Sequence, residues 1–455
     1  MGISLFMTTH SQTFTTSDTK EKTIGILGLG HVGLTLGLTI ADAGFSVRGF
    51  DIKADVREKI ASGKAHFSEK GLDDLLHKNL GSTFTVVDAL NDKTRCDIYI
   101  VTVGTPLDAD KHADYGFIRS AGEDIGAIIK KGDLVILRST VPLGTTRDVV
   151  TPIIEKVSGL KRGEFSIAFA PERTVEGNAL YELRALPQIV GGLDERSTDI
   201  TEALFKTFTD TVVRMHSLEE AEMVKLVNNT YRETVFSFAN EISMIARKWG
   251  MDTKKVIESA NAGYLRSNVP LPSPGVGGYC LTKDAYLLME SAEAKGVKPH
   301  LIHQARYVTA YILDSIGKEI EDFVREHHKE KKEVRIAILG FAFKGKPATS
   351  DTRGSTTPVL MKRLRSLPVK VKIVGYDPAV HEGKIVEMGA DPVGSIEEAV
   401  RGSHIVIIMN NNPAFANLPH EHVSGADGKV MLYDTWGLHH KDHFKDHPHV
   451  KHSTL

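Results

Sequence analysis

Short apolar runs alternate with helix-compatible stretches over the first part of the chain. A run that begins at Thr23 leads into a glycine-rich turn and then a helix of small residues, which we expect to end near Gly44. A second run follows at once and closes on Asp51. Three later runs have the length of buried strands and cover residues 97–103, 134–140 and 165–171. Because strands and helices alternate, the pattern predicts a mostly parallel, doubly wound α/β sheet.

The same order of elements recurs in the last part of the chain. Residues 334–340 repeat the first strand, residues 371–377 the second, and residues 403–409 the strand at 97–103. The pattern therefore predicts an internal duplication, with two Rossmann-like sheets in one chain. In the second copy the segment Phe341-Ala-Phe-Lys344-Gly345 replaces the glycine turn, so we expect its ligand to be held by side chains more than by a bare helix N-terminus. Two half-sites that differ in this way suggest two different ligands.

Between the copies the pattern becomes helical. Apolar residues recur at intervals of three and four with no helix breaker before Gly250, which predicts one long central helix joining the two sheets. These residues are Ala221, Val224, Leu226, Val227, Tyr231, Val235, Phe238, Ile242, Ile245 and Trp249. The charged run Lys329–Glu333 predicts a solvated linker into the last domain.

The chain is long enough for several domains, because one hydrophobic core rarely serves 455 residues. We expect a disordered tail over residues 1–20, a dinucleotide-binding domain over 21–214, a helical middle over 215–328 and a second Rossmann-like domain over 329–455.

Composition narrows the classes of function. Lys plus Arg total 56 against 58 Asp plus Glu, so we expect no broad basic surface for nucleic acid or for an anionic membrane. Cys96 and Cys280 are the only cysteines, and they lie far apart without metal-ligand spacing. We therefore expect neither a disulfide framework nor a metal site, and a reducing cytoplasm fits best. No apolar run reaches the length of about 18 residues that a membrane span needs.

The glycine-rich turn carries the first sign of chemistry. Gly28 permits the turn, Gly30 lets the backbone approach a pyrophosphate, and Gly33 allows close helix packing. A tight turn that needs small residues is the alternative interpretation, but the turn follows a strand, opens a helix and is completed by Asp51. Asp51 would accept hydrogen bonds from a ribose diol and repel a 2′-phosphate, although Lys53 nearby counts the other way. The pattern favours NAD over NADP.

Cys280 lies in a segment rich in glycine and proline that begins at Pro272. These residues fix the backbone and place the thiol beside Lys283 and Asp284. A cysteine usually does no more than pack in a core. Here a nearby cation would lower the pKa of the thiol, and the glycines would let a substrate approach closely, so the setting predicts a nucleophile.

Further polar residues lie where ligands are expected. Lys225 and Asn229 are four apart on the predicted long helix and so share one face, a spacing that solvated helices also carry routinely. Glu172 follows Ala170-Pro171 at the end of a predicted strand, where doubly wound sheets place their ligands.

Together these motifs resemble those of the UDP-glucose/GDP-mannose dehydrogenase family. The resemblance runs in family order from about residue 22 to the end of the chain. The motifs are Gly28-Leu-Gly-His-Val-Gly33, Gly104-Thr105-Pro106, Ser139-Thr140-Val-Pro, Pro171-Glu172-Arg173, Lys225-Leu-Val-Asn-Asn229-Thr-Tyr, Gly277-Gly278-Tyr-Cys280-Leu-Thr-Lys283-Asp284 and Gly340-Phe-Ala-Phe-Lys344.

The resemblance implies two successive oxidations of a nucleotide sugar at C6 without release of the aldehyde. It implies that Cys280 attacks the aldehyde to give a thiohemiacetal, which is oxidised to a thioester and then hydrolysed. Lys225 would stabilise the developing oxyanion, with Asn229 as a second donor. Asp284 would position water or accept its proton, and Glu172 would assist hydrolysis. The helical middle would form a homodimer, and the last domain would hold the nucleotide.

The resemblance also implies the rest of the site. Residues assigned to NAD, beside Gly28, Gly30, Gly33, Asp51 and Lys53, are His31, Val32, Thr105, Pro106, Thr140, Lys283 and Arg353, of which Thr140 is also assigned to catalysis. Residues assigned to the nucleotide sugar, beside Glu172, Lys225 and Asn229, are Arg173, Arg266, Gly277, Gly278, Phe343 and Lys344. Arg353 would also contact the nucleotide sugar, and Arg266 would reach the site of the neighbouring subunit.

The choice of sugar depends on local detail. Residues 170–178, 187–192 and 274–278 resemble the branch that oxidises UDP-linked 2-acetamido sugars. Tyr279 stands where that branch has histidine and Ala285 where it has proline. Residues 282–284 resemble the UDP-glucose branch instead. We expect a UDP-N-acetylhexosamine, with UDP-glucose and GDP-mannose as alternatives.

Other classes of protein share parts of this pattern. β-Hydroxyacid dehydrogenases also join a Rossmann domain to a helical one with a lysine and an asparagine on a long helix, but they need no cysteine and lack a second Rossmann copy. A non-catalytic nucleotide-sugar-binding protein would not need Cys280, Lys225 and Asp284 together.

Overall fold

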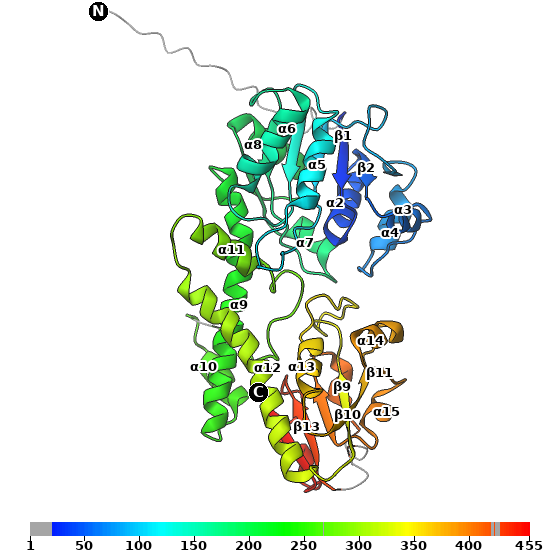
Figure 1. The fold of residues 1–455 in the computed structure, drawn as a ribbon. Helices are drawn as coiled ribbons and strands as arrows, with labels where there is room; N and C mark the ends of the chain where they lie inside the picture. The colour runs from blue at the N-terminus through cyan, green and yellow to red at the C-terminus, as the bar shows by residue number, and fades with distance from the viewer. Residues whose placement is uncertain (1–20, 267, 420–422, 424–427) are drawn as a thin grey trace, which may run out of the picture. The chain divides into compact units, whose positions relative to one another are not determined.

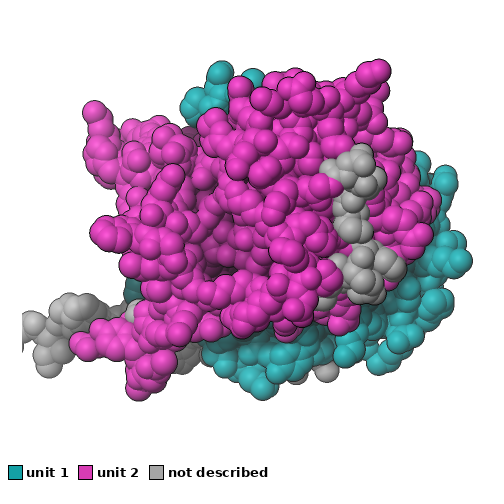
Figure 2. All heavy atoms as spheres, turned by 90° about the horizontal axis from the view of Figure 1, so that it is seen from below, with its two compact units in different colours: residues 1–225 teal, residues 226–455 magenta. Residues whose placement is uncertain are grey.

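The computed structural model describes residues 21–266, 268–419, 423 and 428–455, and the tail expected over residues 1–20 lies outside them. The chain divides into two compact units, residues 1–225 and residues 226–455 (Figure 2). Each unit has its own sheet and its own hydrophobic core.

The described part of the first unit forms an eight-stranded sheet in the order β3-β2-β1-β4-β5-β6-β7-β8 (Figure 1). The strands are β1 (Thr23–Leu27), β2 (Ser46–Phe50), β3 (Phe84–Val87), β4 (Ile98–Val101), β5 (Leu134–Leu137), β6 (Ser166–Phe169), β7 (Gln188–Gly192) and β8 (Val212–Arg214). Neighbouring strands run parallel except β6 and β7. The mostly parallel sheet predicted from the alternating pattern is thus confirmed.

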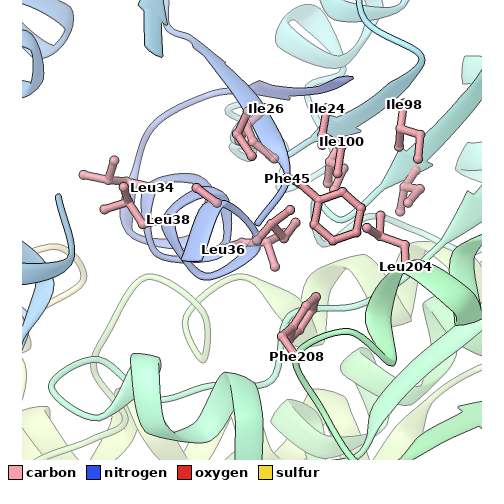
Figure 3. Packing of buried hydrophobic residues seen from close by; sticks show 14 of the residues in the cluster. Ile24, Ile26, Leu34, Leu36, Leu38, Phe45, Ile98, Ile100, Leu204 and Phe208 are labelled. Atoms are coloured by element: carbon pink, nitrogen blue, oxygen red, sulfur yellow. The ribbon is translucent and has the colours of Figure 1, made fainter. Parts of the chain in front are cut away.

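Helices flank this sheet, and both of its faces are buried. They are α2 (His31–Asp42), α3 (Ala54–Ala61), α4 (Leu72–Asn79), α5 (Gly116–Gly126), α6 (Thr151–Ser158), α7 (Ala179–Ala185) and α8 (Glu195–Phe205). Ile98 and Ile100 pack in one core with α2 (Figure 3), whereas Tyr99 and Val101 pack in the core on the opposite face. Because both faces are covered, each strand reads as a continuous apolar run rather than an alternating one.

The long helix α9 (Leu218–Lys248) confirms the predicted central helix. Its apolar side chains lie partly on the buried side and partly on the exposed side. Tyr231 and Trp249 are 67% and 76% exposed. Besides apolar residues such as Leu226 and Ala239, it buries a series of polar residues that recur at intervals of four, four, four and three, namely Lys225, Asn229, Glu233, Ser237 and Asn240. The helical period was therefore predicted correctly from apolar residues that lie largely on the exposed side.

The described part of the second unit contains a six-stranded parallel sheet in the order β11-β10-β9-β12-β13-β14 (Figure 1). The strands are β9 (Glu333–Leu339), β10 (Lys370–Tyr376), β11 (Asp391–Pro392), β12 (Ile405–Ile408), β13 (Val430–Asp434) and β14 (Val450–Thr454). Both sheets place the third, second and first strands side by side and then cross to the other edge, which confirms two Rossmann-like sheets. Because β9 begins at Glu333, the charged linker is one residue shorter than predicted.

The helices of the second unit serve two parts of it. They are α10 (Thr253–Asn261), α11 (Asp284–Glu293), α12 (His300–His327), α13 (Thr357–Leu364), α14 (Glu382–Met388) and α15 (Ile396–Val400). Ile316 and Phe323 of α12 share a core with Ile336 and Ile338 of β9, so α12 covers one face of the second sheet. Each fully buried isoleucine stabilises such a core by roughly 1.5–3 kcal/mol. Across the described residues, no helix combines the length and the apolar character needed to cross a membrane.

Candidate active site

The glycine-rich turn lies between β1 and α2. The Gly28 amide donates to the Phe50 carbonyl across 2.8 Å, which seats the turn at the end of β2. A Cβ atom at Gly33 would lie 1.8 Å from the Gly28 carbonyl oxygen, so only glycine lets α2 begin this close to the turn. Gly30 is exposed at the N-cap of α2 and has no side chain to cover the helix end, which bears His31 and Val32. A pyrophosphate fits such a helix N-terminus.

Asp51 closes β2 in a half-buried position. Its Oδ2 accepts from the Leu29 amide at 2.8 Å and its Oδ1 from the Lys53 amide at 2.9 Å. Each carboxylate oxygen can accept more than one hydrogen bond, so this geometry leaves capacity for a ribose diol. The residues of the first turn therefore fit NAD.

The equivalent acid of the second sheet, Asp377, is turned inward and only 4% exposed. Its Oδ2 accepts from the amides of Phe341 and Ala342, at 2.7 and 3.0 Å, and from the Asn410 side chain at 3.1 Å. The protein's own donors thus take the place of a ribose. The second half-site differs from the first, as predicted.

Two loops at the carboxyl ends of β4 and β5 lie beside the glycine turn. The Thr102 hydroxyl donates to the Gly28 carbonyl at 2.7 Å, and the Ser139 hydroxyl donates to the Val103 carbonyl at 2.6 Å. These bonds bring the predicted cofactor residues Thr105, Pro106 and Thr140 to the same edge of the sheet. Thr105 is buried, whereas Pro106 and Thr140 are half-buried.

Glu172 is buried at the carboxyl end of β6 and paired with Arg138. The Arg138 guanidinium donates to Oε2 of Glu172 through Nε at 3.1 Å and Nη2 at 2.7 Å. Oε1 accepts from the amides of Arg173 and Thr174. Burial would raise the pKa of Glu172, but Arg138, the Thr174 amide and Lys225 together lower it below its ordinary value. Glu172 is therefore anionic, and both of its oxygens accept from protein donors.

Arg138 immediately precedes the Ser139-Thr140 motif, and sequence reasoning did not single it out. It is 2% exposed and also donates to the Ala170 carbonyl and the Gln188 side chain. An arginine at the end of an apolar strand, followed by a polar loop, was the available signal. Arg173 is half-buried and donates to the Pro187 carbonyl.

The first turns of α9 are fastened to the loop that follows Thr140. Oε2 of Glu222 accepts from the Gly144 amide at 2.6 Å, and Oε1 accepts from the Thr146 amide at 2.9 Å. Burial raises the pKa of Glu222 to about 7, against the lowering effect of the Thr146 hydroxyl. Lys225 lies one turn further along α9 and is 7% exposed. This fastening was missed, because Glu222 looks like an ordinary surface glutamate in the sequence.

Cys280 is exposed and lies in the turn that leads into α11, whose N-cap is Lys283. Its carbonyl accepts from the amides of Lys283 and Asp284 at 3.1 and 2.9 Å, so the loop bends directly into the helix. A Cβ atom at Gly278 would lie 2.8 Å from the Phe343 ring, which explains why glycine is needed there.

Asp284 is fully buried, and among the described residues its Oδ2 takes a hydrogen bond while its Oδ1 has an ion-pair partner but no hydrogen bond. Its Oδ2 accepts from Nδ2 of Asn229 at 2.6 Å, and its Oδ1 lies 3.3 Å from Nζ of Lys283. The structure therefore brings together three predicted residues, Asn229, Lys283 and Asp284, next to Cys280.

A second ion pair lies behind this group and was not predicted. Arg306 of α12 donates to Glu233, which is one turn beyond Asn229 on α9. Burial raises the pKa of Glu233, Arg306 lowers it, and the charge of Asp284 raises it further. The spacing of four residues from Lys225 to Asn229 to Glu233 was the signal that could have identified it.

The predicted residues of the last domain lie on the loops that follow β9. Oδ1 of Asn411 accepts from the amides of Gly345 and Lys346 at 2.9 and 3.1 Å and so fixes the loop that carries Phe343 and Lys344. Arg353 is exposed and pairs with Asp351 at 2.7 Å. Lys344, Phe343 and Arg353 thus belong to one region.

Two further observations complete the survey. Arg266 is exposed, with its guanidinium over the Tyr264 ring at 4.8 Å from the centroid. Within the described residues, no three or more His, Cys, Asp and Glu side chains gather as a metal site would require.

Models of three protein domains match the chain. Residues 22–209 match the NAD-binding domain of the UDP-glucose/GDP-mannose dehydrogenase family, residues 219–310 match its central domain, and residues 337–441 match its UDP-binding domain. A UDP-N-acetyl-D-mannosamine dehydrogenase from Pyrococcus horikoshii is 32% identical over 90% of this chain and 93% of its own. The chain belongs to the UDP-glucose/GDP-mannose dehydrogenase family.

Other relatives agree. A UDP-N-acetyl-D-mannosamine dehydrogenase from Methanocaldococcus jannaschii is 31% identical over 91% of this chain and 92% of its own. The solved structure of a UDP-D-ManNAc dehydrogenase from Pyrococcus horikoshii has a TM-score of 0.85 at 29% identity, covering 95% of this chain and 99% of that one.

Membership confirms the resemblance seen in the sequence. The protein is an NAD-dependent nucleotide-sugar 6-dehydrogenase, and NAD is its cofactor. The β-hydroxyacid dehydrogenase alternative is excluded, because the match extends through the second Rossmann-like domain.

Proposed function

We propose that the substrate is a UDP-linked N-acetylhexosamine, with N-acetylmannosamine as the first candidate. The names of the relatives at 31–32% identity support this choice, as do the three segments that resemble the acetamido-sugar branch. UDP-glucose and GDP-mannose are the alternatives. Tyr279 and Ala285 depart from the acetamido-sugar branch, and residues 282–284 resemble the UDP-glucose branch. The product is the corresponding uronic acid.

Cys280 is the covalent nucleophile in this proposal. NAD, when bound, accepts the two electrons and one hydrogen that leave C6 in each oxidation. After the first, the Cys280 thiolate adds to the C6 aldehyde, forming the C–S bond while the carbonyl electrons move to oxygen. After the second, water adds to the thioester carbon and the C–S bond breaks, which releases the carboxylate and returns the thiolate. The observation that carries this proposal is the exposed thiol in the turn before α11, next to the buried Asp284–Asn229 pair.

The remaining catalytic roles divide by charge. Lys225 and Asn229 stabilise the oxyanion as donors, because they lie one turn apart on α9. Asp284 positions water or accepts its proton. Glu172 assists hydrolysis through its negative charge rather than by taking a proton, because Arg138 and two backbone amides already occupy its oxygens. Thr140 contributes from the loop after β5.

The binding residues are proposed as two sets. The set for NAD is Gly28, Gly30, His31, Val32, Gly33, Asp51, Lys53, Thr105, Pro106, Thr140, Lys283 and Arg353. The set for the nucleotide sugar is Glu172, Arg173, Lys225, Asn229, Arg266, Gly277, Gly278, Phe343 and Lys344. Because Arg353 lies near Phe343 and pairs with Asp351, its geometry supports nucleotide-sugar binding better than NAD binding.

We propose that residues 21–214 bind NAD, residues 215–328 form a homodimer, and residues 329–455 bind the nucleotide in a cytoplasmic enzyme. The exposed apolar side chains of α9 support the dimer, because exposed apolar patches of this kind mark interfaces. Sedimentation of the protein and of Phe238→Glu tests it. A Phe238→Glu variant that stays dimeric would remove this face of α9 from the interface.

The reaction is tested with purified protein, NAD and a panel of sugars. The panel holds UDP-N-acetylmannosamine, UDP-N-acetylglucosamine, UDP-N-acetylgalactosamine, UDP-glucose and GDP-mannose. Two NADH per sugar consumed, with a preference for an acetamido sugar, is the expected result. Preference for UDP-glucose would assign the enzyme to the alternative.

The covalent step is tested with Cys280→Ser. This variant should stop net acid formation while it preserves NAD binding, because an alcohol forms a far less reactive acyl intermediate. Mass spectrometry of a quenched reaction should find sugar attached to the Cys280 peptide of the native enzyme. Near-native turnover by the serine variant would refute the nucleophile.

A further inference from the structure

Two cations, Lys283 and Arg353, lie over the ring of Tyr279, the residue before the proposed nucleophile. Nζ of Lys283, next to α11, lies 5.6 Å from the ring centroid. Cζ of Arg353, from the loop before α13, lies 5.2 Å from it. Cations within about 6 Å of an aromatic centroid are attracted by the negative face of the ring. The side chain of Tyr279 therefore joins the cysteine loop to the last domain.

The backbone makes the same connection. The Gly278 amide donates to the Gly354 carbonyl at 3.2 Å, and Gly277 lies against the Phe343 carbonyl and the Gly354 carbonyl. The Phe343 ring lies so close to Gly278 that a Cβ atom there would be 2.8 Å from it. The loop that ends in Cys280 is thus seated on the segment from Phe343 to Gly354.

The charge state of the phenol decides the kind of interaction. Burial raises the pKa of Tyr279, Arg353 lowers it, and Cys280 and Asp284 raise it, with a net increase above the ordinary value. The hydroxyl is therefore protonated at neutral pH. Arg353 and Lys283 interact with the neutral ring, and Asp351 accepts from Nε and Nη2 of the Arg353 guanidinium.

We propose that Tyr279 is a positioning residue that couples nucleotide binding in the last domain to the placement of Cys280. The proposal rests on the proposed roles of Cys280 as nucleophile and Arg353 as a nucleotide-sugar contact. A diphosphate that binds Arg353 would contact the same guanidinium that lies over the Tyr279 ring. A shift of that guanidinium moves the Tyr279 ring and with it the adjacent Cys280. The thiol therefore takes the position required for attack when the nucleotide is bound.

The test uses alkylation of Cys280 by iodoacetamide, with and without saturating UDP, followed by peptide mass spectrometry on the whole enzyme. In the native enzyme, UDP should change the alkylation rate by about threefold or more. Tyr279→Phe keeps the ring and should keep this ratio, whereas Tyr279→Leu should reduce it to about one. Tyr181→Leu removes an exposed tyrosine of α7 and serves as the matched control. UDP saturation is checked for each variant by calorimetric titration.

Each outcome bears on the coupling. If UDP merely shields the thiol, Tyr279→Leu will keep the native ratio and the proposal is wrong. It is equally wrong if UDP does not bind or leaves the native rate unchanged. Arg353→Met removes the other half of the contact without altering the cysteine loop, so it should also lose the ratio and serves if Tyr279→Leu fails to fold. Alkylation needs no turnover, so an enzyme inactive on every sugar would contradict the proposed function and leave the coupling measurable.

Steady-state kinetics give an independent reading. Tyr279→Leu and Arg353→Met should each lower kcat/KM for the nucleotide sugar by at least about threefold, and the double variant should lose less than the product of the two effects. Fully multiplicative losses would show that the two side chains act separately and would overturn the coupling. The KM for NAD should stay within about twofold in Tyr279→Leu, which a general loss of structure would not spare.

Discussion

Asn229 donates a hydrogen bond from Nδ2 to Oδ2 of Asp284 across 2.6 Å, and both side chains are buried. Asn229→Ala should leave the buried carboxylate without this donor. The expected loss of folding free energy is about 1–3 kcal/mol, with a fall in kcat, because an unpaired buried acceptor bears its full desolvation cost. Urea unfolding and turnover on one preparation measure both, with Asn91→Ala on an exposed loop as the control. Unchanged stability and kcat would mean that the pair contributes nothing.

Lys225→Ala should depress turnover far more than substrate affinity. A buried donor at a developing oxyanion is worth about 3 kcal/mol, or roughly a hundredfold or more in kcat. A lysine on a solvated helix face would instead change stability by less than about 0.5 kcal/mol and leave the rate alone. Thermal unfolding, substrate affinity and kcat separate these cases. A variant that folds, binds and turns over normally removes Lys225 from the mechanism.

Asp51→Ala should raise the KM for NAD much more than the KM for the nucleotide sugar, because Asp51 faces the adenine ribose in the proposed site. Asp377→Ala is its matched control from the second sheet. Asp377→Ala should instead decrease the free energy of unfolding, because Asp377 accepts from the amides of Phe341 and Ala342. Equal use of NADP by the native enzyme would count against the role of Asp51.

Glu222 should make folding stability depend on pH. Burial raises its pKa from 4.5 to about 7, so the folded state binds this proton more tightly than the unfolded state. The contribution of Glu222 to the free energy of unfolding is fully present below about pH 4.5. It decreases by on the order of 3 kcal/mol as pH rises through about 7. From pH 5 to pH 8 the urea midpoint should therefore fall further in the native protein than in Glu222→Gln. Parallel pH slopes for the two proteins would contradict the assignment.

The strands and the first half-site could be predicted because their signals are local. Gly28, Gly33 and Asp51 lie within one βαβ unit, where spacing and conformation determine each other. Glu222 and Thr146 are 76 residues apart, and Glu233 and Arg306 are 73 apart, so their pairing depends on the finished fold. On α9 the apolar period identified the helix but not its buried face, because buried polar side chains are paired there with partners that no local pattern specifies.

The closed carboxylate of Asp377 has a kinetic consequence. Of the two Rossmann-like turns that the structure describes, the second has its acid buried with three donors on one oxygen, and the NAD-binding family model matches only the first domain, so we expect one dinucleotide site in each chain. Two oxidations must then share that place in succession, with spent cofactor leaving and fresh cofactor entering between them. During that exchange the half-oxidised sugar has to stay bound while the cofactor site is empty. In the proposed mechanism a bond to the Cys280 sulfur would lengthen its residence beyond what hydrogen bonds alone would give, so the rate of cofactor exchange, rather than the affinity for aldehyde, would limit how often a partly oxidised product escapes.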